Sequence, residues 1–172
     1  VGEFNFFAKD YLGARKVYSV EPYSGSYKLL KKNCAKDTYN YAISKNSEER
    51  LYLSEVSTQL NSLSTPGVSN LKSELVKAIG IDKLVELKKI GSIDLLKIDV
   101  EGHEIEALDT DKKTLNNIKY LFIEISLDVE GEYNLKKLYE KLQELTSREF
   151  RTVGLSDYSQ SDRSIDILLK FA

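Results

Sequence analysis

Two long apolar segments limit most strongly how this chain can fold. Residues 93–100 and 120–126 are nearly continuous runs of apolar residues with the length of strands. Strands of this character are typical of parallel sheets in which both faces are buried. Because parallel neighbours need a crossover connection, usually a helix, the two segments predict an α/β arrangement.

The rest of the chain continues the alternation of helix and strand. The expected helices are 4–11, 23–34, 82–90 and 135–142, and the further expected strands are 16–20, 37–44, 50–54, 150–155 and 165–171. The segment 74–81 is ambiguous between strand and helix, and we expect Asp82 to cap the helix that follows it.

The last two expected strands are joined by a polar loop that is too short for a helical crossover. They must therefore pair antiparallel. We expect one α/β domain over residues 1–172, with a largely parallel sheet, helices on both faces and a C-terminal antiparallel hairpin.

Composition and charge exclude several classes of protein. With 172 residues, of which 41% are hydrophobic and 30% charged, the chain has room for one ordinary core. A net charge of -2 gives no long-range attraction to nucleic acid. No apolar run is long enough to span a membrane, and the single cysteine, Cys34, cannot form an intrachain disulfide. These features favour a protein of the reducing cytoplasm.

Carboxylates lie at the ends of two expected strands, which is where ligands bind in open α/β sheets. Glu21 follows the strand 16–20, Asp99 lies inside the end of the strand 93–100, and Glu101 comes directly after it. Burying such groups would require partners, so their positions favour a ligand site over a solvated surface.

Glu21 has two interpretations. It stands 19 residues after Gly2, at a position from which a carboxylate accepts hydrogen bonds from both ribose hydroxyls of an adenosyl cofactor. The alternative is a carboxylate that caps the helix beginning near Ser24. We favour the ribose role because Glu-Pro after a strand redirects the chain at the sheet edge.

His103, the only histidine, also has two interpretations. Its charge changes near neutrality, so it could act as a general base for an acceptor hydroxyl. The alternative is a surface residue of a polar turn. A metal site of Asp99, Glu101, His103 and Glu104 is disfavoured because such close spacing hinders all four from pointing inward, and we expect no metal.

Three segments resemble a known family. IDLLKIDVEGHEIEAL is similar to the signature of FkbM-type methyltransferases, a class I family that depends on S-adenosylmethionine. VYSVEPYSGSYKLLKKN is similar to the second strand of that family with its Glu-Pro turn, and NYAISKNSEERLYLS to its third strand and hairpin. A parallel α/β sheet that ends in an antiparallel hairpin is also the layout of class I methyltransferases, whereas the dinucleotide-binding Rossmann sheet is parallel throughout.

The resemblance implies methyl transfer from S-adenosylmethionine, most often to an oxygen acceptor on a sugar or another small metabolite. It also implies that Glu21 holds the ribose and that Ala42 and Ile43 border the adenine. Asp99, which would also face the donor, and Glu101 would lie beside the methyl-transfer site. Three side chains are candidates for the proton acceptor at this site: Asp99, Glu101 and, if it acts as a general base, His103.

The departure from the family lies at the N-terminus. FkbM-type enzymes have a central first strand that ends in a glycine loop near the donor, and here only Val1 and Gly2 could be its tail. The chain contains no methionine, so we expect that Val1 is not the translation start and that the domain is truncated before it. Two rival functions stay open: a nicotinamide-dependent oxidoreductase on a Rossmann sheet, and an inactive truncated relic.

The serine-rich segment 54–70 has no clear periodicity and is predicted to be a loop. A loop of this length in a compact domain is usually functional, so we expect it to shape the acceptor site. Ser62 and Ser64 within it, together with Tyr41, are candidate polar contacts for the acceptor or cofactor, although nothing in their spacing is diagnostic.

Overall fold

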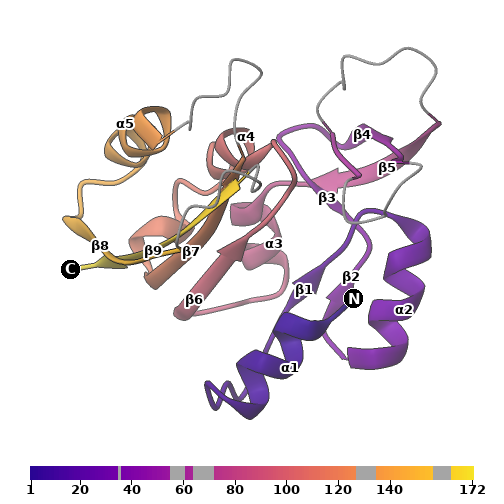
Figure 1. Cartoon of the computed structure of the whole chain (residues 1–172), viewed down its shortest axis with the longest axis horizontal. Helices are drawn as coiled ribbons and strands as arrows, with labels where there is room; N and C mark the ends of the chain where they lie inside the picture. The colour runs from indigo at the N-terminus through magenta and orange to yellow at the C-terminus, as the bar shows by residue number, and fades with distance from the viewer. Residues whose placement is uncertain (35, 55–60, 64–71, 127–134, 157–163) are drawn as a thin grey trace.

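The structure is a computed structural model that describes residues 1–34, 36–54, 61–63, 72–126, 135–156 and 164–172, arranged as a mixed α/β protein (Figure 1). The helices are α1 (Glu3–Asp10), α2 (Ser24–Cys34), α3 (Ile81–Leu87), α4 (Glu104–Leu108) and α5 (Leu135–Leu145), with the 3-10 helix η2 (Thr114–Asn116). The strands are β1 (Ser19–Val20), β2 (Thr38–Tyr39), β3 (Ala42–Ile43), β4 (Glu48–Tyr52), β5 (Ser73–Ile79), β6 (Ile93–Ile98), β7 (Ile118–Ser126), β8 (Phe150–Leu155) and β9 (Ser164–Phe171).

The described strands form three separate sheets rather than one. β1 pairs parallel with β2, and β5 pairs parallel with β3 and antiparallel with β4. The third sheet has the order β6-β7-β9-β8, in which β6 and β7 are parallel and β9 is antiparallel to both of its neighbours. The C-terminal antiparallel hairpin is therefore confirmed, whereas the parallel arrangement holds only for individual pairs of strands.

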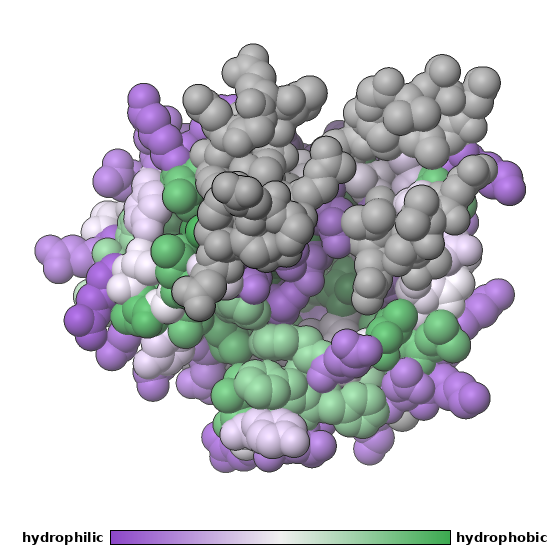
Figure 2. Space-filling model, viewed as in Figure 1, coloured by the Kyte–Doolittle hydropathy of each residue, from purple (hydrophilic) through white to green (hydrophobic). Residues whose placement is uncertain are grey.

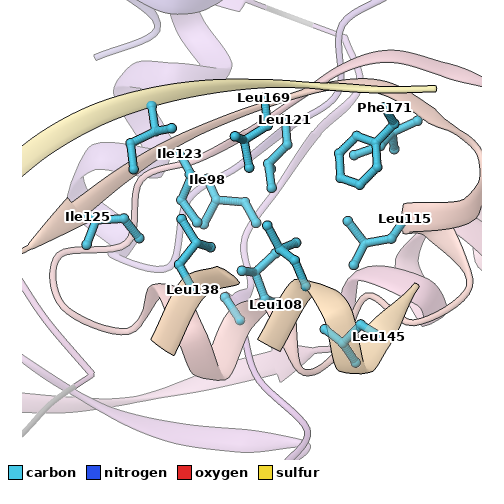
Figure 3. Packing of buried hydrophobic residues seen from close by; sticks show 14 of the residues in the cluster. Ile98, Leu108, Leu115, Leu121, Ile123, Ile125, Leu138, Leu145, Leu169 and Phe171 are labelled. Atoms are coloured by element: carbon cyan, nitrogen blue, oxygen red, sulfur yellow. The ribbon is translucent and has the colours of Figure 1, made fainter. Parts of the chain in front are cut away.

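The main core lies between the four-stranded sheet and the helices α3, α4 and α5 (Figure 3). Leu121, Ile123 and Ile125 alternate along β7 and are at most 1% exposed, and they meet Leu138 and Leu142 of α5. The residues between them on β7 are only half-buried. The expectation that this strand is buried on both faces is thus wrong, because the second face is covered incompletely by α1.

Helix α1 joins the two-stranded sheet to the four-stranded sheet. Asn5 Nδ2 donates a hydrogen bond to Ser19 Oγ of β1 at 3.0 Å. The ring of Phe4 stacks on that of Phe122 in β7 with centroids 6.0 Å apart, and Lys97 Nζ of β6 lies 5.5 Å from the centroid of Phe4. Among the described residues no strand pairs with both β1 and β6, so a missing central strand stays a prediction.

Large apolar side chains remain exposed on α1 and just after it, as Figure 2 shows for the end of the molecule where this helix lies. They are Phe6, Phe7, Tyr11 and Leu12. This surface belongs to a short helix, and the helices in the described part of the chain are too short or too polar to cross a lipid bilayer.

The segment 37–44 is not one strand, as expected, but the two strands β2 and β3, which pair with β1 and β5 respectively. The break falls at Asn40, whose side-chain Nδ2 donates to the carbonyl oxygens of Glu21 and Pro22 at 2.8 Å each. This contact ties the end of β2 to the turn after β1. The ambiguous segment 74–81 is mostly the strand β5.

Asp82 does not cap α3, because the N-cap position is Gly80. Its carboxylate instead accepts hydrogen bonds from the backbone N–H groups of Lys113 and Thr114, both at 2.7 Å. These groups lie at the start of η2, so Asp82 fixes that 3-10 helix against α3. The acidic residue therefore caps a helix distant in sequence rather than its own.

Asp111 is a buried acid beside this contact. Its side chain is 0% exposed, and neither carboxyl oxygen has a hydrogen-bond partner among the described residues. Burial raises the pKa of Asp111 to about 8; the charge of Asp82 adds to this rise, and the neighbouring side chain of Thr114 opposes it. At neutral pH the group is therefore held mainly in its uncharged form, which the core tolerates better.

Replacing this acid should make stability less dependent on pH. The pKa of Asp111 in the folded protein lies above its ordinary value of 3.8. As the pH rises, the unfolded chain therefore loses this proton at a lower pH than the folded protein does. The free energy of unfolding should therefore fall as pH rises from about 4 to about 8, by up to about 1.4 kcal/mol per pH unit. Urea unfolding at two pH values in this range measures how much the free energy of unfolding changes with pH. This change should be smaller in Asp111→Asn than in the unaltered protein, and it should be the same as in the unaltered protein for the exposed control Asp94→Asn. An unchanged difference in Asp111→Asn would contradict this account.

Candidate functional site

The chain leaves β6 through a turn with an unusual backbone. Glu101 has a φ of 50° and Gly102 a φ of 91°. A positive φ is unfavourable for a residue that carries a Cβ, so the backbone of Glu101 is strained and needs support. Gly102 N donates to Glu104 Oε1 at 2.7 Å, and Ser62 Oγ donates to the carbonyl oxygen of Glu101 at 2.6 Å. These bonds hold the turn, and Ser62 reaches it from the predicted acceptor loop, most of which lies outside the described residues.

The side chain of Glu101 is half-buried among charges of the same sign. Burial is the main cause that raises the pKa of Glu101 to about 7. The negative charges of Asp99, Glu124 and Glu104 add to the rise, and the positive charge of Lys97 opposes it. A carboxyl group with such a pKa gains and loses a proton near neutral pH, which is what general acid–base chemistry requires.

Asp99 lies next to Glu101 but has a different partner. Its Oδ2 forms an ion pair with Lys97 Nζ. Lys97 also lies over the rings of Phe4 and Phe122, 5.5 and 5.7 Å from their centroids, which holds the ammonium group in place. Asp99 is therefore paired with a cation, whereas the described ion pairs do not include Glu101.

The described ion-pair partner of His103 is an acid of α4. Its Nδ1 lies 3.9 Å from Glu106 Oε2, and His103 is not among the main charges that act on Glu101. No described hydrogen bond or ion pair joins His103 to Asp99. In the described part of the chain, no group of three or more His, Cys, Asp or Glu side chains is arranged to hold a metal ion.

Glu124 belongs to the same cluster, and it is not among the predicted site residues. It lies near the end of β7, and Ser164 Oγ of β9 donates a hydrogen bond to Glu124 Oε1 at 2.6 Å. Its charge acts on Glu101 from the neighbouring strand. The available signal in the sequence was an acidic residue inside an otherwise apolar strand.

Glu21 follows β1, as predicted, and one of its oxygens is occupied. Its Oε1 accepts the backbone N–H of Tyr23 at 2.9 Å, and no second described hydrogen bond reaches the carboxylate. Burial raises the pKa of Glu21, while the bond from Tyr23 opposes this rise. The carboxylate therefore bonds the turn that precedes α2, and the ribose role of Glu21 stays a prediction.

A groove with a volume of about 480 Å³ lies beside this turn. Its lining includes Pro22, three tyrosines, polar residues of the turn and α2, and residues 74–77 of β5. Aromatic rings and polar side chains share its walls, so the groove offers contacts to both the rings and the hydroxyl groups of a small organic molecule.

The other predicted donor contacts are less well placed. Ala42 is 2% exposed within a second core, and Ile43 packs against the main core. A Cβ at Gly2 would lie 2.9 Å from Cys34 Sγ, which places Gly2 at the C-terminal end of α2. Glu21 precedes the other end of this helix, which is about 16 Å long. The structure therefore does not bring Gly2 to Glu21.

Comparison with known proteins gives one family and one relative. The family model described as Methyltransferase FkbM domain matches residues 2–152. Hexuronic acid methyltransferase AglP of Haloferax volcanii is 34% identical over 76 residues, which are 44% of this chain and 32% of that protein. The matched region thus spans about a third of the length of the relative. No solved structure matches the chain.

The strain at Glu101 can be measured by two substitutions that both remove the carboxylate. Glu101→Gly should be more stable than Glu101→Ala by about 1 kcal/mol, because alanine keeps the Cβ that disfavours a positive φ. Urea unfolding of the two variants measures the difference. Equal midpoints, or a more stable alanine variant, would show that the backbone at this turn is not strained.

Proposed function

The chain belongs to the FkbM methyltransferase family, and we propose that it transfers the methyl group of S-adenosylmethionine to a hydroxyl oxygen of a sugar or another small metabolite. The relative from Haloferax volcanii is named a hexuronic acid methyltransferase, which supports a sugar as the acceptor. The observation that carries the proposal is Glu101, a half-buried carboxyl group at the carboxyl end of β6 with a pKa of about 7. Such a group suits the removal of a proton from a hydroxyl.

The residues at the ends of β1 and β6 fit a donor that carries an adenosyl group and a positive charge. Glu21 has one oxygen available for ribose hydroxyls, and the groove of about 480 Å³ next to it has the size and aromatic lining that suit a nucleoside. Around Glu101 the carboxylates outnumber the single cation Lys97, which complements a positive sulfonium. Ala42 and Ile43 would contribute through their backbone, and Gly2 is left out of this donor site.

The reaction assigns a separate task to each side chain. When bound, the donor supplies a methyl group on positively charged sulfur, whose bond to carbon breaks with the electron pair left on sulfur. Glu101 accepts the proton of the acceptor hydroxyl as that oxygen forms its bond to the methyl carbon. Asp99, paired with Lys97, keeps a negative charge beside the donor. His103 contacts Glu106 instead, so we do not assign it the proton.

The rival oxidoreductase has less support, because the antiparallel β8–β9 hairpin has no place in an all-parallel Rossmann sheet. The inactive relic differs from an active enzyme in binding no donor. Both rivals can therefore be separated from the methyltransferase by ligand binding alone.

Glu21→Gln should weaken the binding of S-adenosylhomocysteine about 10- to 100-fold, because a hydrogen bond to a charged group contributes about 1.5–3 kcal/mol. Calorimetric titration measures the affinity, with Glu48→Gln on β4 as an exposed control that should bind like the unaltered protein. An unchanged affinity in Glu21→Gln would remove the ribose assignment. Binding of NAD in place of S-adenosylhomocysteine would favour the oxidoreductase, and binding of neither would favour the relic.

A further inference from the structure

The pairing of β6 with β7 places a second acid beside Glu101. The two strands are parallel, with Ile98 opposite Ile123, and both of these side chains are buried in the core. Glu124 is the next residue of β7 and projects from the opposite, half-buried face, and the exposed Asp99 directly follows β6 at the same carboxyl end of the sheet. The turn that carries Glu101 begins at the same edge.

The surroundings of Glu124 are not those that stability alone would favour. Asp166 of β9 is its partner in the strand register, and like charges directly opposite each other destabilise a sheet. Among the described residues Glu124 has no ion-pair partner. Its described partner is the hydroxyl of Ser164, at 2.6 Å. A short hydrogen bond from a neutral donor holds a carboxylate in place without cancelling its charge.

We propose that Glu124 is a positioning residue of the methyl-transfer site: Ser164 holds its carboxylate, and its negative charge makes Glu101 a stronger proton acceptor. This inference rests on the proposed function for the step that it serves.

The main charged groups that act on Glu101 are Lys97 from β6, Asp99 directly after that strand, Glu124 from β7 and Glu104 from α4. Asp99 is offset by its ion pair with Lys97. Glu104 accepts the N–H of Gly102 within the turn itself. The charge of Glu124 is the contribution that comes from outside the segment of Glu101, and it can be removed without changing the turn.

The test follows the titration of Glu101 directly. The chemical shift of its side-chain carboxyl carbon is recorded by NMR against pH, in the protein without ligand and in Glu124→Gln. The pKa of Glu101 should be lower in this variant by at least about half a unit, because a like charge has been removed. Ser164→Ala should lower it by a smaller amount, because the carboxylate of Glu124 is then no longer held in place and can move away from Glu101.

Glu106→Gln is the matched control. Glu106 lies on α4 close to the same turn, but it is not among the main charges that act on Glu101, so this variant should change the pKa of Glu101 much less than Glu124→Gln does. The inference is overturned if Glu124→Gln and Ser164→Ala both titrate like the unaltered protein, or if Glu106→Gln shifts as far as they do.

Methyl transfer is measured against pH in the same variants. In Glu124→Gln the rise of kcat should begin at lower pH, and kcat at its plateau should fall severalfold, because a carboxylate with a lower pKa is a weaker base. A shifted NMR titration together with no methyl transfer under any condition would uphold the link between the two acids and refute the proposed function. An absent NMR shift would refute the link whatever the activity is.

Discussion

The burial of one face of β7 is the constraint on which the rest of the structure depends. Leu121, Ile123 and Ile125 are at most 1% exposed, and they pack against the helices that cover the sheet. Because side chains alternate along a strand, this burial also fixes what the other face carries. A slip of one residue would bring Glu124 into the core and lift Ile123 out of it. The hydrophobic packing of the sheet thus determines which acid stands beside Glu101.

The elements that were predicted well are those whose pattern is determined locally. The hairpin of β8 and β9 and the helix α5 have strong periodicity, and a short loop leaves the two strands no other way to pair. The segment 37–44 was misjudged because its residues favour strand throughout, while its halves pair with different strands. Asp82 was misjudged for a similar reason, since the N–H groups that it caps lie 31 and 32 residues away. Local propensity contains no information about such distant partners.

The residues of the candidate site also fall into those that local sequence identifies and those that depend on distant partners. Asp99 and Glu101 could be selected from the sequence because residues just after a strand lie at the edge where ligands bind. The role of His103 as proton acceptor stays a prediction, because the direction of its side chain depends on a turn with two successive positive φ values. The role of Glu124 is not predicted from the sequence, because its partner Ser164 is 40 residues away. Sequence position identifies the edge of the sheet, but tertiary pairing decides which side chains act together.

The acidic character of the site also determines the order of donor binding and proton release in the proposed reaction. Without ligand, Glu101 has a pKa of about 7, so it carries a proton in a large fraction of molecules at neutral pH. A positively charged donor placed beside it lowers this pKa, because an opposite charge favours the ionised carboxylate. Donor binding therefore releases the proton from Glu101 before the acceptor hydroxyl has to give up its own. By linkage, the donor binds more tightly as pH rises through about 7, and an affinity that does not change across this range would contradict the sequence of events.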